Sequence, residues 1–375
     1  MPTPKRRLFA AILGLAIVLA LFLPRFLRHS VPPRYTVTDL GVLPGDTASG
    51  AFAVNSAGVA VGDSSGASEQ ACVFKNGTVI KLTSDSIARG INAQGEIAGE
   101  TDLPEVHQAF LYNHGKMHTL GALPGFSQSE IAAINDKGEI TGKAISFVPQ
   151  LGTTHKHAFV YVQGKMTDLG TLPGTTESEA QSINALGQIV GTCSRSGGFL
   201  AYIPFLYDSS RKTMTALLMP APNLGGAATH INDNGEVVGI VISHGPIYVH
   251  AALWSGGHFT DLGVLPGDMS SVAEGLNNHS EIVGQSHRNN SSSVSRFIER
   301  HAGSSNFWQR YWDRTTITER AFVCQNGRMQ DLNTLIPKDV DWVLEDAESV
   351  NDRGQIVGYG LHHGQKRAFL LTPVR

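Results

Sequence analysis

The chain has 375 residues, of which 41 are glycine, and only 16% of the residues are charged, against roughly 25% in an ordinary soluble domain. Hydrophobic residues make up 41%, which excludes a disordered chain, and the glycine excess favours short strands and tight turns over helical bundles. Residues 35–375 carry 23 basic and 32 acidic side chains, and this acidic balance excludes nucleic-acid binding.

Residues 1–30 predict an export signal. Lys5-Arg6-Arg7 precedes an unbroken apolar run from Leu8 to Leu23, and Pro24 ends it. We interpret the segment as an apolar helix that stays attached and anchors the chain in the membrane, because no small-residue cleavage site follows. A cleaved signal peptide remains the alternative, since the run is short for a membrane span. The positive-inside rule then places the body outside the cytoplasm, at the cell membrane or secreted.

A tandem repeat organises the rest of the chain. Each unit contains Asn-x-x-Gly-x-[IV]-x-Gly, with Ala60 replacing the [IV] in the first unit. Counting from the asparagine, the glycine at position +7 is always present, and the glycine at +3 is replaced once, by Ser280. We interpret these residues as turn residues, because asparagine caps hairpins and glycine takes a positive φ. The repeat asparagines are Asn55, Asn92, Asn135, Asn184, Asn232, Asn277 and Asn351.

Each unit predicts four antiparallel strands, exemplified by Ser-x-Ala-x-x-Ile-Asn, Gly-x-Ile-Val-Gly, Ala-Phe-Leu-Tyr and Lys-Met-Thr-Asp-Leu. Such short strands are not stable alone and stack as propeller blades. The last unit ends with its third strand at 368–371, while residues 35–40 form a fourth strand without a blade. The sequence therefore predicts an all-β, monomeric, seven-bladed β-propeller of four-stranded antiparallel blades over residues 35–375. The N-terminal strand closes the ring, and one apolar N-terminal helix precedes it.

The repeated phrases resemble the bacterial extracellular HAF-repeat family. The resemblance is carried by 168–174 (Asp-Leu-Gly-Thr-Leu-Pro-Gly), by 183–191 and by His157-Ala158-Phe159, and it covers nearly all of residues 38–371. It implies export and tandem repetition and transfers no catalytic residue. His-Ala-Phe is intact once, and its first position is otherwise Gln70, Gln108, His250, Arg320 or Arg367. We expect these first-position side chains to hydrogen-bond nearby loop backbone.

The segment 285–319 is a long insertion in the sixth unit, between its second and third strands. It contains Trp308, Tyr311 and Trp312, with Arg310 and Arg314 beside them. A short helix would place the three aromatic side chains on one face. These five residues are the candidate ligand- or partner-binding residues, as part of a lid, and an aromatic plug over the mouth of the ring is the structural alternative.

The sequence contains none of the familiar nucleophile, zinc or phosphate-binding motifs, and it indicates no metal site and no cofactor. His362-His363 has no spaced third ligand, and Cys72 and Cys324 are expected in the core. We therefore expect a non-catalytic extracytoplasmic propeller that binds or scaffolds a protein or glycan at the cell envelope. The alternatives are a propeller hydrolase or lyase with an axial active site and a purely structural envelope module.

Overall fold

The structure is a computed structural model that describes residues 34–103, 106–148, 153–195, 202–219, 223–243, 248–288 and 319–374. The chain divides into two units, Met1–Pro33 and Arg34–Arg375, and every described residue belongs to the second. The predicted signal segment 1–30 thus lies outside the described residues. Within the described ranges, no helix has the length and apolar character needed to cross a membrane.

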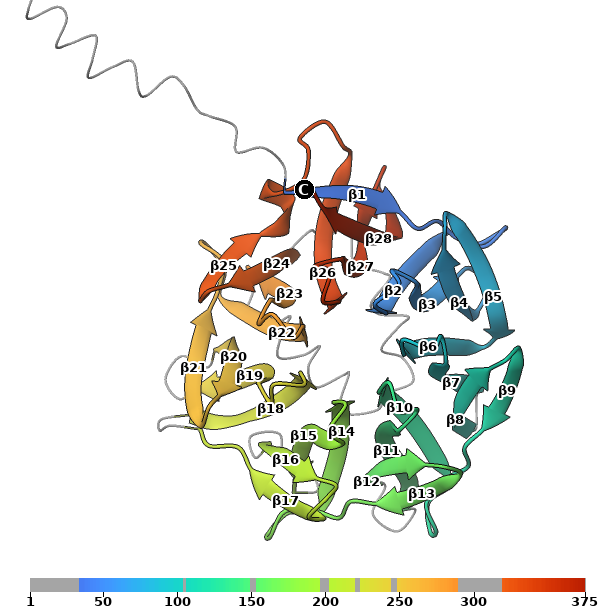
Figure 1. Ribbon diagram of the computed structural model, residues 1–375, viewed down its shortest axis with the longest axis vertical. Coiled ribbons are helices and arrows are strands. Elements are labelled where there is room, and N and C mark those ends of the chain that lie inside the picture. The colour runs from blue at the N-terminus through green and yellow to red at the C-terminus, as the bar shows by residue number, and fades with distance from the viewer. Residues whose placement is uncertain are drawn as a thin grey trace, which may run out of the picture. The chain divides into compact units, whose positions relative to one another are not determined.

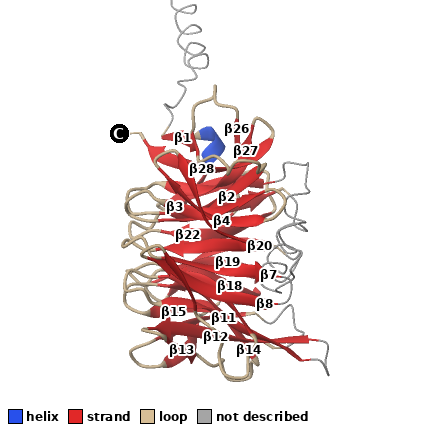
Figure 2. Ribbon diagram, turned by 90° about the vertical axis from the view of Figure 1, so that its right-hand side faces the viewer, coloured by secondary structure: helices blue, strands red, loops and turns tan. Residues whose placement is uncertain are grey.

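The second unit is a ring of seven four-stranded antiparallel sheets around a central axis (Figure 1). The prediction of an all-β, seven-bladed propeller is therefore confirmed. In the side view the strands run across the thickness of the ring and the turns gather at its two faces (Figure 2). The one short helix among the described residues is a 3₁₀ turn at Leu332–Thr334.

The strands fall into four concentric sets. The innermost strands are β2 (Ala48–Val54), β6 (Ser86–Ile91), β10 (Gln128–Ile134), β14 (Glu177–Ile183), β18 (Asn223–Ile231), β22 (Ser270–Leu276) and β26 (Trp342–Val350). The second strands are β3 (Ala60–Ser65), β7 (Ile97–Leu103), β11 (Ile140–Val148), β15 (Gln188–Ser194), β19 (Val237–Ser243), β23 (Ile282–His287) and β27 (Ile356–His362). The third strands are β4 (Glu69–Lys75), β8 (Val106–Asn113), β12 (Thr153–Val162), β16 (Ile203–Asp208), β20 (Val249–Ser255), β24 (Glu319–Gln325) and β28 (Gln365–Pro373). The outer strands are β5 (Thr78–Ser84), β9 (Lys116–Thr119), β13 (Lys165–Asp168), β17 (Thr213–Ala216), β21 (His258–Gly263), β25 (Arg328–Asp331) and β1 (Tyr35–Asp39).

Six blades use four consecutive strands, and the seventh combines residues from both ends of the described chain. Strand β1 pairs antiparallel with β28, from Tyr35 opposite Pro373 to Asp39 opposite Phe369. The sheet order is β1-β28-β27-β26, so β1 occupies the outer edge.

The repeat asparagines form a closed ring of hydrogen bonds that joins all seven blades. Each asparagine Nδ2 donates to the backbone oxygen of the corresponding asparagine in the next blade at 2.9–3.2 Å, and Asn351 donates to Asn55 to complete the circle. The Oδ1 atom accepts backbone N–H groups of the asparagine's own turn, such as those of Leu186 and Gln188 for Asn184. The +3 residue has a positive φ in every unit, including Ser280 at 60°, in agreement with the predicted turn.

The repeated serine of the innermost strand also links neighbouring blades. In the fourth blade, Ser178 Oγ accepts the backbone N–H of Ala158 in the preceding blade at 2.9 Å and donates to Gly170 O at 2.6 Å. The same arrangement recurs at Ser129 and Ser271. The serine therefore satisfies backbone groups that the packing of blades would otherwise leave unpaired.

The core lies between the blades. Phenylalanines of the third strands are fully buried, each worth about 2 kcal/mol of hydrophobic stabilisation; they are Phe110, Phe159, Phe205, Phe322 and Phe369. Each lies opposite the +7 glycine of its blade in the strand register. Cys72 and Cys324 are buried free thiols, as predicted, and burial raises the pKa of Cys72 to about 12.

Candidate functional site: the axial pocket

Every innermost strand carries a β-bulge three residues before its repeat asparagine. The register between the first two strands of each blade skips one residue at this point. A bulge re-aims the extra side chain, and all seven extra residues line a pocket of about 330 Å³. They are Phe52, Arg89, Ala132, Gln181, Thr229, Glu274 and Glu348. Because each blade contributes one, the pocket lies on the propeller axis.

The +7 glycines have a different role from the turn role that we expected for them. A Cβ atom at Gly142 would lie 2.0 Å from the backbone oxygen of Glu130, and at Gly239 it would lie 1.9 Å from that of Ala227. The equivalent distance is at most 2.3 Å in all seven blades. No side chain fits there, because the bulge brings the first two strands together. The invariant glycine and the pocket-facing residue are therefore two consequences of one bulge.

One wall of the pocket is an ion-pair network that begins in the second blade. The Arg89 guanidinium donates to Glu100 Oε1 through Nη2 at 2.9 Å and through Nε at 3.2 Å. Glu100 Oε2 accepts the backbone N–H of Ile131 in the third blade at 3.3 Å. Both charged side chains line the pocket, and their pairing fixes the positions of their polar atoms.

The network continues across the third and fourth blades. Lys143 Nζ lies 3.1 Å from Glu130 Oε2 and 3.2 Å from Glu179 Oε2. Lys156 Nζ lies 3.0 Å from the other oxygen of Glu179. The cations and carboxylates of this wall therefore neutralise one another, as buried charges require.

The electrostatics of this wall follow from burial and pairing. Burial raises the pKa of Glu100, a shift that the Arg89 guanidinium opposes and the nearby Glu130 carboxylate reinforces. Burial acts to raise the pKa of Glu130 too, but Lys143 outweighs it and the pKa falls below its usual value. For Lys143 itself, burial is outweighed by Glu130 and Glu179, so its pKa rises and it stays charged.

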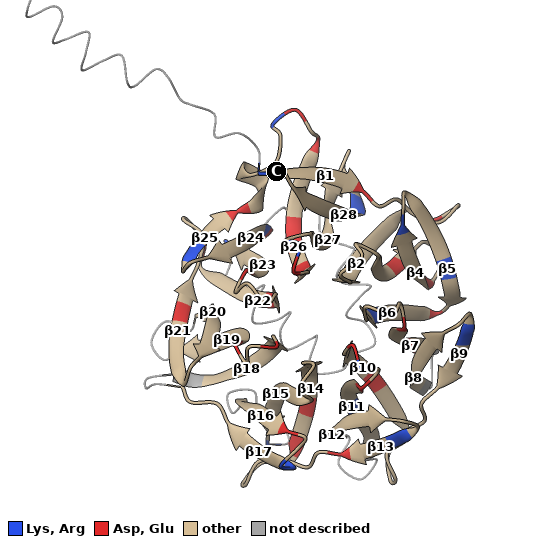
Figure 3. Ribbon diagram, viewed as in Figure 1, with Lys and Arg blue, Asp and Glu red and all other residues tan. Residues whose placement is uncertain are grey.

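The opposite wall, from the fifth to the seventh blade, is different. His230 and Thr229 line it from β18, and Glu274 from β22 accepts a hydrogen bond from Gln285 Nε2 at 3.3 Å. Burial lowers the pKa of His230 to about 4, so its imidazole is uncharged at neutral pH. Ile240 takes the place that Lys143 and Glu100 hold in their blades. Figure 3 shows acidic residues along several innermost strands around the axis.

The five candidate residues of the insertion, Trp308, Arg310, Tyr311, Trp312 and Arg314, lie outside the described residues. Of the predicted segment 285–319, the ends belong to strands, because β23 continues to His287 and β24 begins at Glu319.

Side chains at the first position of the His-Ala-Phe phrase form two kinds of contact. Arg367 Nη1 donates to the backbone oxygen of Thr47 at 2.6 Å, which is the backbone contact that we expected, whereas the two histidines pair with carboxylates. His157 Nδ1 lies 2.7 Å from Asp168, and His250 Nδ1 lies 3.1 Å from Asp261, in both cases joining the third strand to the outer strand. These pairs lie at the periphery of the blades rather than at the axis.

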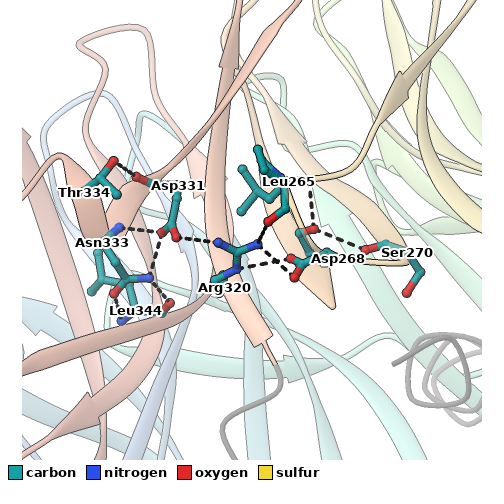
Figure 4. A network of polar contacts seen from close by, with 10 residues as sticks. Leu265, Asp268, Ser270, Arg320, Asp331, Asn333, Thr334 and Leu344 are labelled. Carbon is teal, nitrogen blue, oxygen red and sulfur yellow. Dashed lines mark hydrogen bonds and ion pairs between the residues drawn. The ribbon is translucent and has the colours of Figure 1, made fainter. Parts of the chain in front are cut away.

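Arg320 holds the equivalent position in the sixth blade and is the centre of a larger network (Figure 4). Its guanidinium lies 2.8 Å from Asp268 in the connection between the fifth and sixth blades and 3.1 Å from Asp331 at the end of the outer strand. It also donates to the backbone oxygen of Pro266 at 3.0 Å, which is the expected kind of contact. Asp331 in turn accepts the backbone N–H of Asn333, whose side chain bonds the seventh blade at Leu344.

Within the described ranges, no three histidine, cysteine or acidic side chains gather in a way that would hold a metal ion. His362 and His363 are engaged by carboxylates: their Nδ1 atoms lie 2.9 Å from Asp39 and 2.7 Å from Asp341. His362 also stacks on Trp342, with 4.5 Å between ring centroids.

We did not predict the pocket-lining residues from the sequence. Their signal is nevertheless present in the repeat, at the third residue before each asparagine. The fourth residue before the asparagine is alanine in six of seven units, whereas the third differs in almost every unit. A position that varies between constant neighbours faces an environment other than the blade core, and here that environment is the axis.

No family model matches the chain, and no curated protein matches it in sequence. Among solved structures, it is similar to an oligogalacturonate lyase in complex with manganese, with a TM-score of 0.54 and 12% identity, over 92% of this chain and 97% of that one. A puromycin-hydrolysing peptidase of Mycobacterium tuberculosis gives a TM-score of 0.51 and 9% identity, over 89% and 52%. TolB from Acinetobacter baumannii gives 0.41 and 10%, over 82% and 60%. The chain thus spans only about half of the peptidase, and at these identities the likeness establishes the propeller fold alone.

Proposed function

We propose that the protein is an extracytoplasmic binding propeller that captures a small group of a protein or glycan partner in its axial pocket. The observation that carries the proposal is the bulge in all seven innermost strands, which turns one side chain per blade toward a single pocket. A purely structural ring has no need of a polar axial pocket, because packing the axis with apolar side chains would be more stable. At about 330 Å³, the pocket is at the small end of ligand sites and suits one sugar unit or one peptide end.

The cellular location that we propose rests on the N-terminal sequence. Under this proposal, the apolar segment 1–30 holds the ring at the outer side of the cell membrane, and the aromatic residues 308–312 add contacts to the same partner. Cell fractionation with N-terminal sequencing tests the anchor. A mature chain that begins beyond Arg28 and is found in the medium would show secretion instead.

Ala132→Trp tests the pocket directly. Ala132 is the smallest of the bulge residues, and an indole at this position fills space on the axis without breaking an ion pair. We expect wild-type protein to retain ligands on immobilised glycan and tetrapeptide arrays and Ala132→Trp to lose them. Leu186→Trp, on an exposed turn, is the control that adds the same side chain elsewhere. Unchanged binding by folded Ala132→Trp would refute the axial site.

A hydrolase or lyase with an axial site is the second candidate. It is favoured by the carboxylates that reach the pocket from separate blades, at Glu100, Glu130, Glu274 and Glu348. Retained array ligands, incubated with the protein and examined by mass spectrometry, decide between binding and cleavage. Cleavage that is lost in Glu130→Gln would establish the enzyme, whereas intact ligands would establish the binding module.

A further inference from the structure

His230 departs from its own repeat at a position where a large side chain is costly. The residue two before the asparagine is Ala53, Gly90, Ala133, Ser182, Gly275 or Ser349 in the other units. This position abuts the next blade: a Cβ at Gly275 would lie 3.0 Å from the backbone oxygen of Glu348, and one at Gly90 would lie 3.1 Å from Ile134. Packing against the next blade therefore explains the small residue at this position in six units, but it does not explain the histidine in the fifth.

The imidazole of His230 is on the pocket wall and uncharged. Because burial holds its pKa at about 4, one ring nitrogen donates and the other accepts a hydrogen bond throughout the physiological pH range. Among the described residues, none forms a hydrogen bond or ion pair with this half-buried ring that would account for a histidine at this position. A polar side chain that packing disfavours indicates a role toward a ligand.

Gln181 presents the same hydrogen-bonding character beside it. It is the bulge residue of the fourth blade, it lines the pocket, and its side chain is half-buried. The fourth and fifth blades meet at this depth, where Ser182 Oγ accepts the backbone N–H of Ile231 at 3.4 Å. Gln181 and His230 are thus on neighbouring innermost strands, and each offers both a donor and an acceptor.

The charges of the lining bear on the ligand class. Arg89 is paired with Glu100, and Lys143 with Glu130, so neither cation is available to a ligand carboxylate without loss of a pair. The acidic residues of the lining outnumber the basic ones, which disfavours an anion further. A hydroxyl group both donates and accepts hydrogen bonds, so it can bind Gln181 and His230. Because it is uncharged, it does so without breaking the ion pairs of the lining.

We propose that the group captured in the axial pocket is an uncharged sugar unit, and that Gln181 and His230 are the residues that select it. This inference rests on the proposed function and narrows it, because the charges of the pocket lining disfavour a peptide carboxylate. The chemistry recognised is a set of hydroxyl groups at fixed positions. The Gln181 amide and the His230 imidazole each offer such hydroxyls both a donor and an acceptor.

The repeat supplies variants that retain the fold. His230→Ala restores the small residue that other blades have, and Gln181→Ala restores the residue of the third blade, Ala132. The control is His258→Ala, which removes an exposed histidine of an outer strand. Binding is measured by calorimetry with neutral hexoses, each compared with its 2-amino and its uronate counterpart.

We expect at least one neutral hexose series to bind about 10-fold more tightly than its amino and uronate counterparts. We expect each pocket variant to weaken that binding by about 10-fold or more, as removal of a hydrogen-bonding pair does, and His258→Ala to leave it unchanged. Affinity should be constant between pH 5.5 and 8, because His230 does not titrate there. Tighter binding of the amino or uronate form, or full affinity in His230→Ala, would overturn the inference. If the protein binds tetrapeptides and Ala132→Trp abolishes that binding, the sugar inference is overturned but the axial binding site is supported. If the protein binds neither array, the sugar inference and the proposed binding function are both overturned.

Discussion

Asn184 allows the two roles of a repeat asparagine to be separated. Its side chain is 3% exposed and forms four hydrogen bonds. Oδ1 accepts the backbone N–H groups of Leu186 and Gln188 in its own turn at 3.0 and 2.9 Å. Nδ2 donates to Asn232 O in the next blade at 3.0 Å and to Gln188 Oε1 at 2.8 Å. Two bonds thus form the turn, and one of the remaining two joins the blades.

The expected costs follow from these bonds. At about 1 kcal/mol per buried hydrogen bond, Asn184→Ala loses about 4 kcal/mol of the free energy of unfolding. Asn184→Asp keeps both acceptors and loses both donors, so it loses at least about 2 kcal/mol at pH 7. In that variant the carboxylate faces carbonyl oxygens, which raises its pKa in the folded state. Its deficit relative to wild type should therefore shrink as the pH falls toward 5, since the protonated acid donates again.

Urea unfolding followed by circular dichroism at several pH values measures these differences. Asn76→Asp is the matched control, because Asn76 is on an exposed outer hairpin and its substitution should change stability by less than about 0.5 kcal/mol. If Asn184→Asp is as stable as wild type at pH 7, the ring of inter-blade hydrogen bonds contributes nothing. If the stability loss of Asn184→Asp is the same at every pH, the proposed role of Asn184 Nδ2 as a hydrogen-bond donor is wrong.

Gly142→Ala should lower the free energy of unfolding by about 3 kcal/mol or more, because its Cβ would lie 2.0 Å from a backbone oxygen. Gly164→Ala, which has open space but a φ of 85°, should lower it by about 1 kcal/mol. Equal losses in thermal unfolding would refute the explanation of the +7 glycine by the bulge. Asp63 is buried, no described side chain hydrogen-bonds its carboxylate, and burial holds its pKa well above the usual value. The folded state therefore binds this proton more tightly than the unfolded state, so wild-type stability should fall as the pH rises above about 4. Asp63→Asn should remove that slope and add about 1–3 kcal/mol at pH 7, and a variant less stable than wild type in urea would contradict it. Arg320→Ala should lower the free energy of unfolding by about 3 kcal/mol in the same assay, because it leaves the fully buried carboxylate of Asp268 without its ion-pair partner. Arg320→Lys should recover only part of this loss, because a lysine cannot span the carboxylates of Asp268 and Asp331. Full recovery would show that the charge alone is sufficient.

The repeat determined the blade and the number of blades. Alternation in short segments, the Asn-x-x-Gly turn and seven copies of one phrase are local features, and each has a local physical cause in strand pleating or in positive φ. Local features also identified Cys72 and Cys324 as core residues. The repeat phrase even contained the serine that joins blades, although its partner in the preceding blade was not visible.

Tertiary structure alone decided what faces the axis. A strand pattern has a period of two, so a bulge that inserts one residue re-aims Gln181 or Glu348 in a way that periodicity does not indicate. The +7 glycine was visible in every unit, but its cause is a carbonyl oxygen on the neighbouring strand. The seven bulge residues of the pocket come from seven segments that span about 300 positions of the chain, from Phe52 to Glu348. Only closure of the ring brings them together, and the asparagine ladder that links the blades is equally a property of the closed ring.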